Sequence, residues 1–301
     1  MPLVEVEGHT LSLSNLDKVL YPAVGFTKGQ VIDYYARIAP TLLAHLGDRG
    51  LTLRRFPNGV EGTSFFEKRC PKHRPDWVGT ALGPGDRGGP IGYCVLDTVA
   101  AVVWAANLAA LELHAPMARA ADPETPTLLV FDLDPGEPAA MTECCQIALE
   151  IREVLAAVSL RAWPKTSGSK GLQVYVPLNA SATADPPTHD RARDFALAVA
   201  QLLARRHPTR VTSEMAKAVR PGKIFIDWSQ NTRHKTTIGV YSLRARPEPT
   251  VSTPLRWEEV AAAAEGQVEV RFTAEQVLAR VDQHGDLFAE TVTVVQHLPR
   301  G

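Results

Sequence analysis

Hydrophobic and polar residues follow a helical period in several stretches of this chain. Between residues 31 and 42, apolar side chains recur every three or four positions directly after Thr27, which predicts a helix capped by that threonine. Residues 99–111 are almost all apolar, which is typical of a buried helix. Helices are therefore expected over residues 27–42, 99–111, 141–158 and 191–205.

Shorter apolar runs predict strands between these helices. Strands are expected at residues 51–55, 64–67, 128–131, 161–163, 172–176 and 223–226. Glycine and proline are frequent over 79–92, which indicates a loop, and over 246–254, which indicates a connector. Because strand pairs and helices are mixed without strict alternation, we expect an α+β fold with mixed or antiparallel sheets flanked by helices.

An aspartate pair, Asp132 and Asp134, follows the apolar run 128–131. Alternate residues of a strand point to the same side, so both carboxylates project together and require a cation such as Mg²⁺ or Mn²⁺. Asp227 also ends an apolar strand, and three such carboxylates could hold two metal ions for phosphoryl or nucleotidyl transfer. The competing interpretations are a simple turn ending at Gly136 and, for Asp227, a cap or a salt bridge.

Composition favours a cytoplasmic protein, and the charge distribution is compatible with phosphate binding. The 301 residues are 45% hydrophobic, enough for a large core. The N-terminus has no signal-peptide pattern, and the longest apolar stretch is shorter than the roughly 20 residues of a membrane span. Although the net charge is -1, ten Lys or Arg lie between Arg205 and Arg246, opposed only by Glu214 and Asp227. This basic stripe indicates either phosphate binding or an ordinary solvated surface.

The four cysteines do not form a disulfide framework, and we expect reduced thiols. Cys70 and His73 have the spacing of half a zinc site, but no second pair follows at a suitable distance. We interpret that spacing as coincidence.

The segment Ser167-Gly-Ser-Lys-Gly171 has the composition of an anion cradle. Its glycines permit a close approach of the backbone, and Lys170 adds a positive charge, although a plain hairpin turn is the alternative. His114, Arg244 and Arg246 are further candidates for triphosphate contacts.

Four motifs resemble the archaeo-eukaryotic primase superfamily, most closely the polymerase domain of bacterial ATP-dependent DNA ligase D and its stand-alone relatives. They are Phe-Asp-Leu-Asp-Pro-Gly136, Thr166-Ser-Gly-Ser-Lys-Gly171, Ile226-Asp-Trp-Ser-Gln-Asn231 and Tyr241-Ser-Leu-Arg-Ala-Arg-Pro247. The likeness runs from about residue 13 to 254. It implies a primase-polymerase catalytic domain over residues 1–254, including an N-terminal part that contacts DNA, and a helical extension over 255–301.

The resemblance also implies roles for individual residues. The metal-binding and catalytic carboxylates are Asp132, Asp134 and Asp227. The nucleotide is contacted by Arg54, His114, Ser167, Lys170, Gln230 and Arg244. DNA is contacted by Lys18 and Lys28, which hold a 5′-phosphate, and by the aromatic pair Phe65 and Phe66. One position departs from the family, because Gln173 stands where a histidine is usual, and glutamine cannot carry a proton as imidazole does.

The leading hypothesis is a template-dependent repair polymerase that adds ribonucleotides, and less readily deoxyribonucleotides, to a 3′-hydroxyl at short gaps or break ends. It implies a two-metal Mn²⁺ or Mg²⁺ site, nucleoside triphosphates, and gapped or broken DNA with a 5′-phosphate. We expect a monomer in the bacterial cytoplasm, associated with the nucleoid, with a separate DNA ligase and Ku as candidate partners and no membrane contact. The alternatives are a haloacid-dehalogenase-like phosphatase and a DNA-end-binding module with catalysis weakened by Gln173.

Overall fold

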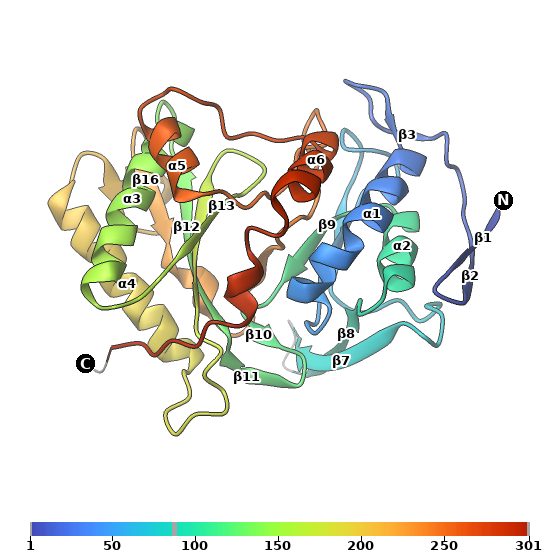
Figure 1. The fold of residues 1–301 in the computed structure, drawn as a ribbon, viewed down its shortest axis with the longest axis horizontal. Coiled ribbons are helices and arrows are strands. Elements are labelled where there is room, and N and C mark those ends of the chain that lie inside the picture. Colours follow the sequence, from blue (N-terminus) through green and yellow to red (C-terminus); the bar gives the residue numbers. More distant parts are fainter. Residues whose placement is uncertain (1, 86–88, 300–301) are drawn as a thin grey trace. The chain divides into compact units, whose positions relative to one another are not determined.

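The computed structural model describes residues 2–85 and 89–299, which fold as two compact units (Figure 1). Unit 1 comprises Met1–Ala121, Thr236–Ser252 and Phe272–Asp286, and unit 2 comprises Asp122–Lys235, Thr253–Arg271 and Leu287–Gly301. The chain contacts therefore group the segments differently from a boundary at residue 254, because the C-terminal residues are shared between both units.

The elements of unit 1 come mostly from the first third of the chain. They are β1 (Leu3–Val6), β2 (His9–Ser12), β3 (Val19–Tyr21), β4 (Phe26–Thr27), α1 (Lys28–Leu46), β5 (Thr52–Arg55), β6 (Phe65–Glu67), β7 (Gly79–Pro84), β8 (Pro90–Val95), α2 (Val99–Asn107), β9 (Ala110–Ala115), β10 (Ala118–Arg119), β17 (Thr237–Ile238) and α6 (Ala274–His284). Its main sheet has the order β17-β9-β5-β6 and is antiparallel.

Helix α1 covers this unit's core and begins where the sequence predicted. The Thr27 hydroxyl accepts a hydrogen bond from the Gln30 backbone N–H, and the Gln30 side chain accepts one from the Thr27 N–H. This capping box satisfies two backbone donors that a helix start leaves unpaired. The buried Tyr34 hydroxyl then donates to the Tyr241 carbonyl, which fixes the helix against a segment more than 200 residues away.

Unit 2 contains the strand that carries the aspartate pair. Its elements are β11 (Asp122–Pro126), β12 (Leu128–Pro135), α3 (Met141–Ala157), β13 (Trp163–Thr166), β14 (Leu172–Pro177), α4 (His189–Arg206), β15 (Val211–Thr212), η1 (Lys217–Val219), β16 (Ile224–Asp227), η2 (Trp228–Asn231), α5 (Trp257–Ala264) and η3 (Ala289–Val292).

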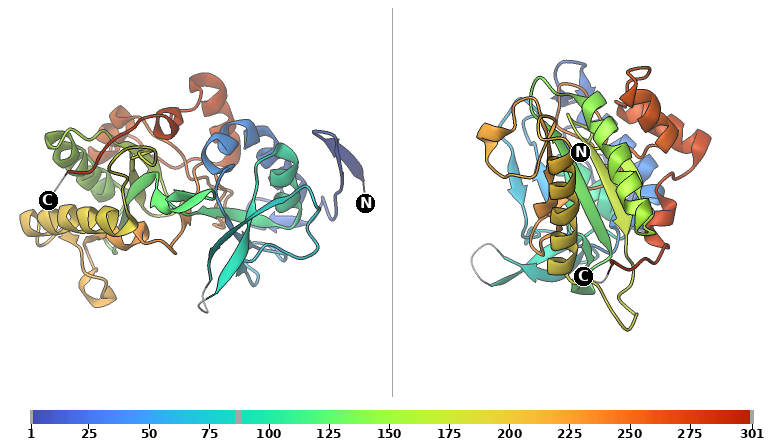
Figure 2. Two further views of the ribbon diagram at one scale, coloured as in Figure 1. Left: turned by 90° about the horizontal axis from the view of Figure 1, so that it is seen from below. Right: turned by 90° about the vertical axis from the view of Figure 1, so that its left-hand side faces the viewer.

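Five of these strands form the sheet β13-β14-β12-β16-β15, which is antiparallel except for the parallel pair β15 and β16. Helices α3 and α4 lie along one face of it (Figure 2). Leu129, Phe131 and Leu133 are fully buried, and alternation along β12 therefore leaves Asp132 and Asp134 on the other face. The α+β prediction, with mixed and antiparallel sheets, is confirmed.

The predicted loop over 79–92 is wrong, because its two flanks form the antiparallel hairpin β7–β8; residues 86–88 of that stretch lie outside the described residues. Its glycines make room for a ring. A Cβ on Gly83 would lie 2.9 Å from the Tyr93 side chain, whose hydroxyl donates to the Pro84 carbonyl. Glycine here permits cross-strand packing of an aromatic ring rather than marking a loop.

The predicted helix over 99–111 is too long. Helix α2 ends at Asn107, and β9 begins at Ala110. Between them the backbone of Ala109 has φ +58°, a left-handed conformation that ends the helix without a glycine. The strand expected at 161–163 also lies further along the chain, as β13.

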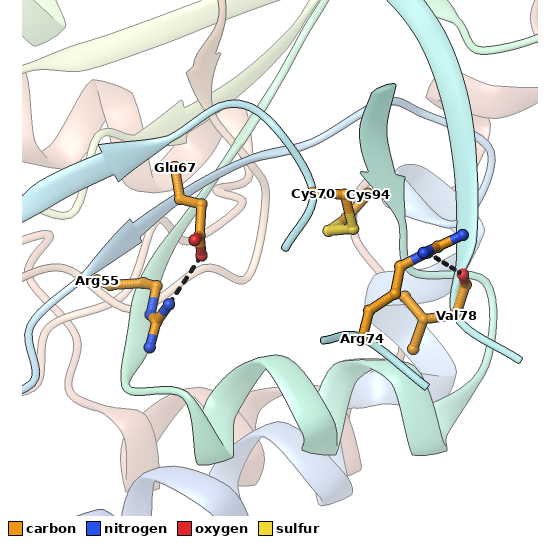
Figure 3. Close-up of a disulfide and its surroundings, with 6 residues drawn as sticks. All are labelled: Arg55, Glu67, Cys70, Arg74, Val78 and Cys94. Atoms are coloured by element: carbon orange, nitrogen blue, oxygen red, sulfur yellow. Dashed lines mark hydrogen bonds and ion pairs between the residues drawn. A yellow bond between two sulfur atoms is a disulfide. The ribbon is translucent and has the colours of Figure 1, made fainter. Parts of the chain in front are cut away.

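The expectation of four reduced cysteines is wrong for two of them. Cys70 and Cys94 form a disulfide with a Cα–Cα distance of 4.8 Å (Figure 3). The Cys70 N–H donates to the Gly92 carbonyl, which holds the segment beside β8 and brings the two Cβ atoms within bridging distance. Cys144 and Cys145 are free and buried. Among the described residues, no helix is both long and apolar enough to cross a bilayer.

Replacing Gly171 by alanine should destabilise the protein strongly, because a Cβ at this position would lie 2.1 Å from the Leu133 carbonyl oxygen. The added Cβ is fixed to the backbone directly before β14 and the carbonyl oxygen belongs to the backbone of β12, so neither can shift without moving a strand. We expect a loss of roughly 3 kcal/mol in the free energy of unfolding. Chemical denaturation measures it. Gly92→Ala is the control, since its Cβ would meet only Thr80, at 4.0 Å. Equal stability of the two variants would contradict this packing.

Candidate active site

The three predicted carboxylates come together on the sheet of unit 2. In the register between β12 and β16, Asp132 lies directly opposite Asp227. Asp134 follows two residues after Asp132 on the same face, and Gln173 lies opposite Asp132 on β14. Opposed residues of an antiparallel pair have Cβ atoms about 4.5–5.5 Å apart, so strand pairing alone gathers these acids.

The neighbouring negative charges contribute to a raised pKa of Asp132. This pKa is raised to about 7, chiefly by burial and then by the nearby Asp134 charge, while a hydrogen bond from Gln173 opposes the rise. Asp227 raises it further, and the positive charge of Lys165 lowers it. A cation beside Asp132 would stabilise the ionised carboxylate, because a nearby positive charge lowers the pKa of a carboxyl group.

The Asp227 side chain is held by the residues that follow it. Its Oδ1 accepts hydrogen bonds from the Ser229 N–H at 3.0 Å and from the Ser229 hydroxyl, and its Oδ2 accepts one from Gln230 Nε2 at 2.9 Å. Lys235 Nζ donates to the Ser229 hydroxyl. Gln230, expected to lie near the nucleotide, is thus a partner of Asp227.

The donor chemistry of these three acids fits a hard divalent cation. Carboxylate oxygens are the ligands that Mg²⁺ and Mn²⁺ prefer, and the mutual repulsion acting on Asp132 favours a cation. Within residues 2–85 and 89–299, however, no three or more His, Cys, Asp or Glu side chains are arranged as a ready-made cage. The hydrogen bonds of Asp227 to Ser229 and Gln230 are consistent with this, because they direct its oxygens to its own 3-10 turn.

The predicted anion cradle is a loop closed by its own serine. The Ser167 N–H donates to the Gly171 carbonyl, and the Ser167 hydroxyl accepts from the N–H groups of Ser169 and Gly171, both at 3.2 Å. Lys170 is exposed and forms a 2.7 Å ion pair with the exposed Glu137. An ion pair this exposed contributes little to stability, so a stronger anion could displace Glu137.

In unit 1, three of the predicted nucleotide contacts surround one buried carboxylate that sequence reasoning missed. Glu112 is 2% exposed and lies on β9. Its Oε2 accepts from Arg54 at 3.3 Å and contacts His114 Nε2 at 2.9 Å, and its Oε1 accepts from Arg244 Nε at 3.2 Å and the Ala245 N–H at 3.1 Å.

Positively charged and hydrogen-bonding neighbours keep the buried Glu112 ionised. Burial alone would raise the pKa of Glu112, but the hydrogen bond from His114 and the charge of Arg244 outweigh it and lower that pKa to about 2. Burial lowers the pKa of His114, so its imidazole is neutral near pH 7 and donates to Glu112 through Nε2. Glu112 therefore holds two guanidinium groups and one imidazole in place.

The aromatic pair lies on the exposed edge strand β6. Phe65 and Phe66 are 44% and 56% exposed, which is high for phenylalanine and leaves room for a base to stack. The rings belong to opposite faces of the strand: Arg55 lies over Phe65 at 5.3 Å and Arg54 over Phe66 at 5.1 Å. Phe66 also contacts His114 edge-on, with a ring distance of 5.5 Å.

Lys18 and Lys28 lie together at the open end of the β3–β4 hairpin. The Lys28 N–H donates to the Lys18 carbonyl, and burial followed by the charges of Lys18 and Arg55 lowers the pKa of Lys28. Lys28 is 5% exposed, with its Nζ bound to the Ser14 carbonyl and hydroxyl, whereas Lys18 is exposed and bonds Asn58.

The predicted residues are divided between the two units. Unit 2 holds the carboxylates with Ser167, Lys170 and Gln230, and unit 1 holds the rest. Two contributors were missed: Glu112, and Lys165, which is buried beside Gln173. The alternation Leu111-Glu112-Leu113-His114 signalled a strand with both polar residues on one face, but the apolar stretch before it obscured that signal.

Comparison with known proteins gives one family. Residues 27–288 match the family model described as LigD, primase-polymerase domain. Over 280 residues the chain is 43% identical to the multifunctional non-homologous end joining protein LigD of Mycolicibacterium smegmatis, covering 92% of this chain and 35% of that protein. It is 30% identical to the bifunctional non-homologous end joining protein LigD of Bacillus subtilis, covering 91% of this chain and 43% of that protein.

A solved structure agrees with these relatives. The polymerase domain from Mycobacterium tuberculosis ligase D in complex with DNA superposes with a TM-score of 0.87 at 40% identity, covering 95% of this chain and 99% of that one. The match covers nearly all of that polymerase-domain chain, whereas this chain spans about a third of the length of the M. smegmatis relative.

Glu112→Gln should lower stability most at neutral pH. The folded-state pKa of about 2 lies below the ordinary 4.5, so ionised Glu112 stabilises the fold fully above pH 4.5 and loses this effect as the pH falls toward 2. The shift corresponds to about 3 kcal/mol. Urea unfolding at pH 7, 5, 4 and 3 should show the difference from the unsubstituted protein shrinking below pH 4.5. A difference that does not vary with pH would contradict an ionised Glu112.

Proposed function

Because the chain belongs to the LigD primase-polymerase domain family, we propose that it is a template-dependent polymerase that extends a 3′-hydroxyl at short gaps and at double-strand break ends. Ribonucleotides are its preferred substrates, and deoxyribonucleotides are used less readily. The observation that carries the proposal is the row of carboxylates on adjacent strands of unit 2, with the pKa of Asp132 raised to about 7. Family membership makes the reaction class nucleotidyl transfer and does not favour a phosphatase.

In this proposal Asp132, Asp134 and Asp227 hold divalent cations, Mn²⁺ or Mg²⁺. The ions supply Lewis acidity, lowering the pKa of the attacking hydroxyl and stabilising charge on the phosphates. The protein's part is to hold the carboxylates at fixed positions on paired strands. Asp227 would hold a cation through its carboxylate oxygens, and Ser229 and Gln230, which donate to those oxygens, position the side chain.

The cluster around Glu112 provides cationic and donor groups for the triphosphate. Arg54 and Arg244 are both oriented by hydrogen bonds to Glu112, and a guanidinium carries five N–H donors in a planar arrangement suited to phosphate oxygens. One buried donor, Arg54 Nε, has no protein partner among the described residues. His114, Ser167 and Lys170 complete the proposed phosphate contacts. Lys170 exchanges its ion pair with Glu137 for one with the triphosphate, which is the stronger anion.

The proposed DNA contacts come from unit 1. Phe65 and Phe66 offer stacking surfaces at the template, and the Lys18 and Lys28 pair binds a 5′-phosphate, whose charge offsets the repulsion between the two ammonium groups. The LigD relatives act in non-homologous end joining, as their names state, and we place this chain in the same repair process. Nick sealing then comes from a DNA ligase activity, with Ku as a candidate partner, and the polymerase acts as a monomer on DNA in the bacterial cytoplasm.

Asp132→Asn should abolish primer extension, by about a thousandfold or more, because it removes the charge that holds the cation while keeping the shape of the side chain. The assay is extension of a gapped, 5′-phosphorylated duplex with Mn²⁺ and nucleoside triphosphates, and a gel shift should show DNA binding within about twofold of the parent protein. Asp190→Asn, on the exposed start of α4, is the control. Extension that survives Asp132→Asn excludes the carboxylate mechanism.

Lys18→Met should remove the preference for a 5′-phosphate at the far side of the gap. A hydrogen bond to a charged group contributes about 1.5–3 kcal/mol, so affinity for the phosphorylated duplex should fall about tenfold or more, toward that of the 5′-hydroxyl duplex. Fluorescence anisotropy with both duplexes measures the difference. Arg37→Met removes one charge from the exposed surface of α1 and should leave the preference intact. A 5′-phosphate preference unchanged by Lys18→Met would assign it elsewhere.

A further inference from the structure

A row of four polar residues crosses the sheet of unit 2, one from each of four adjacent strands. Lys165 on β13 pairs with Gln173 on β14, Gln173 pairs with Asp132 on β12, and Asp132 pairs with Asp227 on β16. Paired residues place their side chains on the same face, so all four lie on the face opposite α3 and α4. Lys165 and Gln173 are the two members of this row to which the mechanism assigns no role.

Lys165 is an unusual residue for such a position. Its side chain is 0% exposed, and lysine is almost never fully buried unless it is paired. Its Nζ donates to Gln173 Oε1 at 2.5 Å and lies 5.3 Å from the centre of the Tyr175 ring. Burying an ammonium group is costly, so its partner groups must be held firmly to it.

Lys165 makes the shorter of two hydrogen bonds that orient the Gln173 amide, since Gln173 Oε1 also accepts from the Tyr175 hydroxyl, at 3.5 Å. A side-chain amide has one acceptor oxygen and one donor nitrogen. With Oε1 turned to the Lys165 ammonium, the amide N–H₂ donates to the Asp132 carboxylate. The flipped amide would set its N–H₂ against the ammonium and its oxygen against the carboxylate, which is unfavourable at both ends.

We propose that Lys165 is a positioning residue that acts through Gln173 and holds the Asp132 carboxylate in the orientation that binds the divalent cation. This proposal rests on the proposed function, because it concerns the same metal site. It also explains how the chain does without the histidine usual at position 173. A glutamine can donate to Asp132 as reliably as a ring nitrogen, provided that a fixed cation on its other side prevents the amide from turning.

Replacing Lys165 should change the cation affinity in opposite directions, depending on whether Lys165 acts only through its charge or by orienting Gln173. If its charge acted only at a distance, its loss would strengthen cation binding, because one positive charge near the metal would disappear. If it acts through Gln173, its loss frees the amide, the Asp132 carboxylate becomes mobile, and cation binding weakens. The direction of the change therefore separates the two roles.

The experiment is Mn²⁺ binding to the full chain without DNA or nucleotide, measured from the electron paramagnetic resonance signal of free Mn²⁺. Lys165→Met should weaken Mn²⁺ binding about tenfold, as loss of a group that orients a metal ligand commonly does. Arg193→Met, which removes one exposed charge from α4, should change binding less than about twofold. Mn²⁺ affinity unchanged or increased in Lys165→Met overturns the proposal.

Gln173→Glu tests the donor itself. It keeps an acceptor for Lys165 and so preserves that contact, but it has no N–H₂ to offer Asp132. Charge alone would strengthen Mn²⁺ binding in this variant, whereas loss of the donor weakens it. Weaker Mn²⁺ binding supports the proposal, and unchanged or tighter binding overturns it. If Lys165→Met does not fold, the result for Gln173→Glu is sufficient to test the proposal.

Mn²⁺ binding to Asp132→Asn, measured in the same way, distinguishes a failure of the proposed metal site from a failure of the positioning role of Lys165. If Asp132→Asn binds Mn²⁺ like the parent protein, the metal site of the proposed function is wrong, and the role of Lys165 falls with it. If Asp132→Asn loses binding while Lys165→Met and Gln173→Glu do not, the proposed function stands and only the positioning role is excluded.

Discussion

The repulsion between Asp132 and its neighbouring carboxylates is the constraint on which the structure of unit 2 depends. Strand register places Asp227 opposite Asp132, and alternation places Asp134 beside it. Nothing in strand pairing favours this, because like charges directly opposite one another destabilise a sheet. The sheet tolerates them because the strand faces that meet α3 and α4 are apolar and fully buried, and because neutral donors hold the acids.

Each of the opposed aspartates reaches a lysine through one intervening polar group. Asp132 is linked through Gln173 to Lys165, and Asp227 through Ser229 to Lys235. This arrangement places positive charge near enough to reduce the repulsion, with a neutral side chain, Gln173 or Ser229, between each lysine and its aspartate. A direct ammonium partner would compete with a divalent cation for the same oxygens, and the relays avoid that competition.

Unit 1 has the opposite arrangement. There a single carboxylate, Glu112, is buried among Arg54, His114 and Arg244, and its pKa is lowered to about 2 rather than raised. Removing one member of a buried ionic cluster leaves the others uncompensated, which gives Glu112 an importance that its position between two leucines does not suggest. The hydrogen bonds to Glu112 fix the orientation of both guanidinium groups.

The sequence by itself determined that Asp132 and Asp134 share one face of a strand, where α1 begins and that the fold is α+β, because these follow from local periodicity, capping and strand alternation. It did not determine the end of α2, since Ala109 turns the chain with a positive φ that no glycine announces, nor the Cys70–Cys94 bridge, which depends on two segments meeting in space. Only the tertiary structure decided that Lys165 and Gln173 belong to the row of Asp132, and that Glu112 gathers Arg54 and Arg244. Strand register fixes such neighbours, and register is set by long-range pairing rather than by the order of residues along the chain.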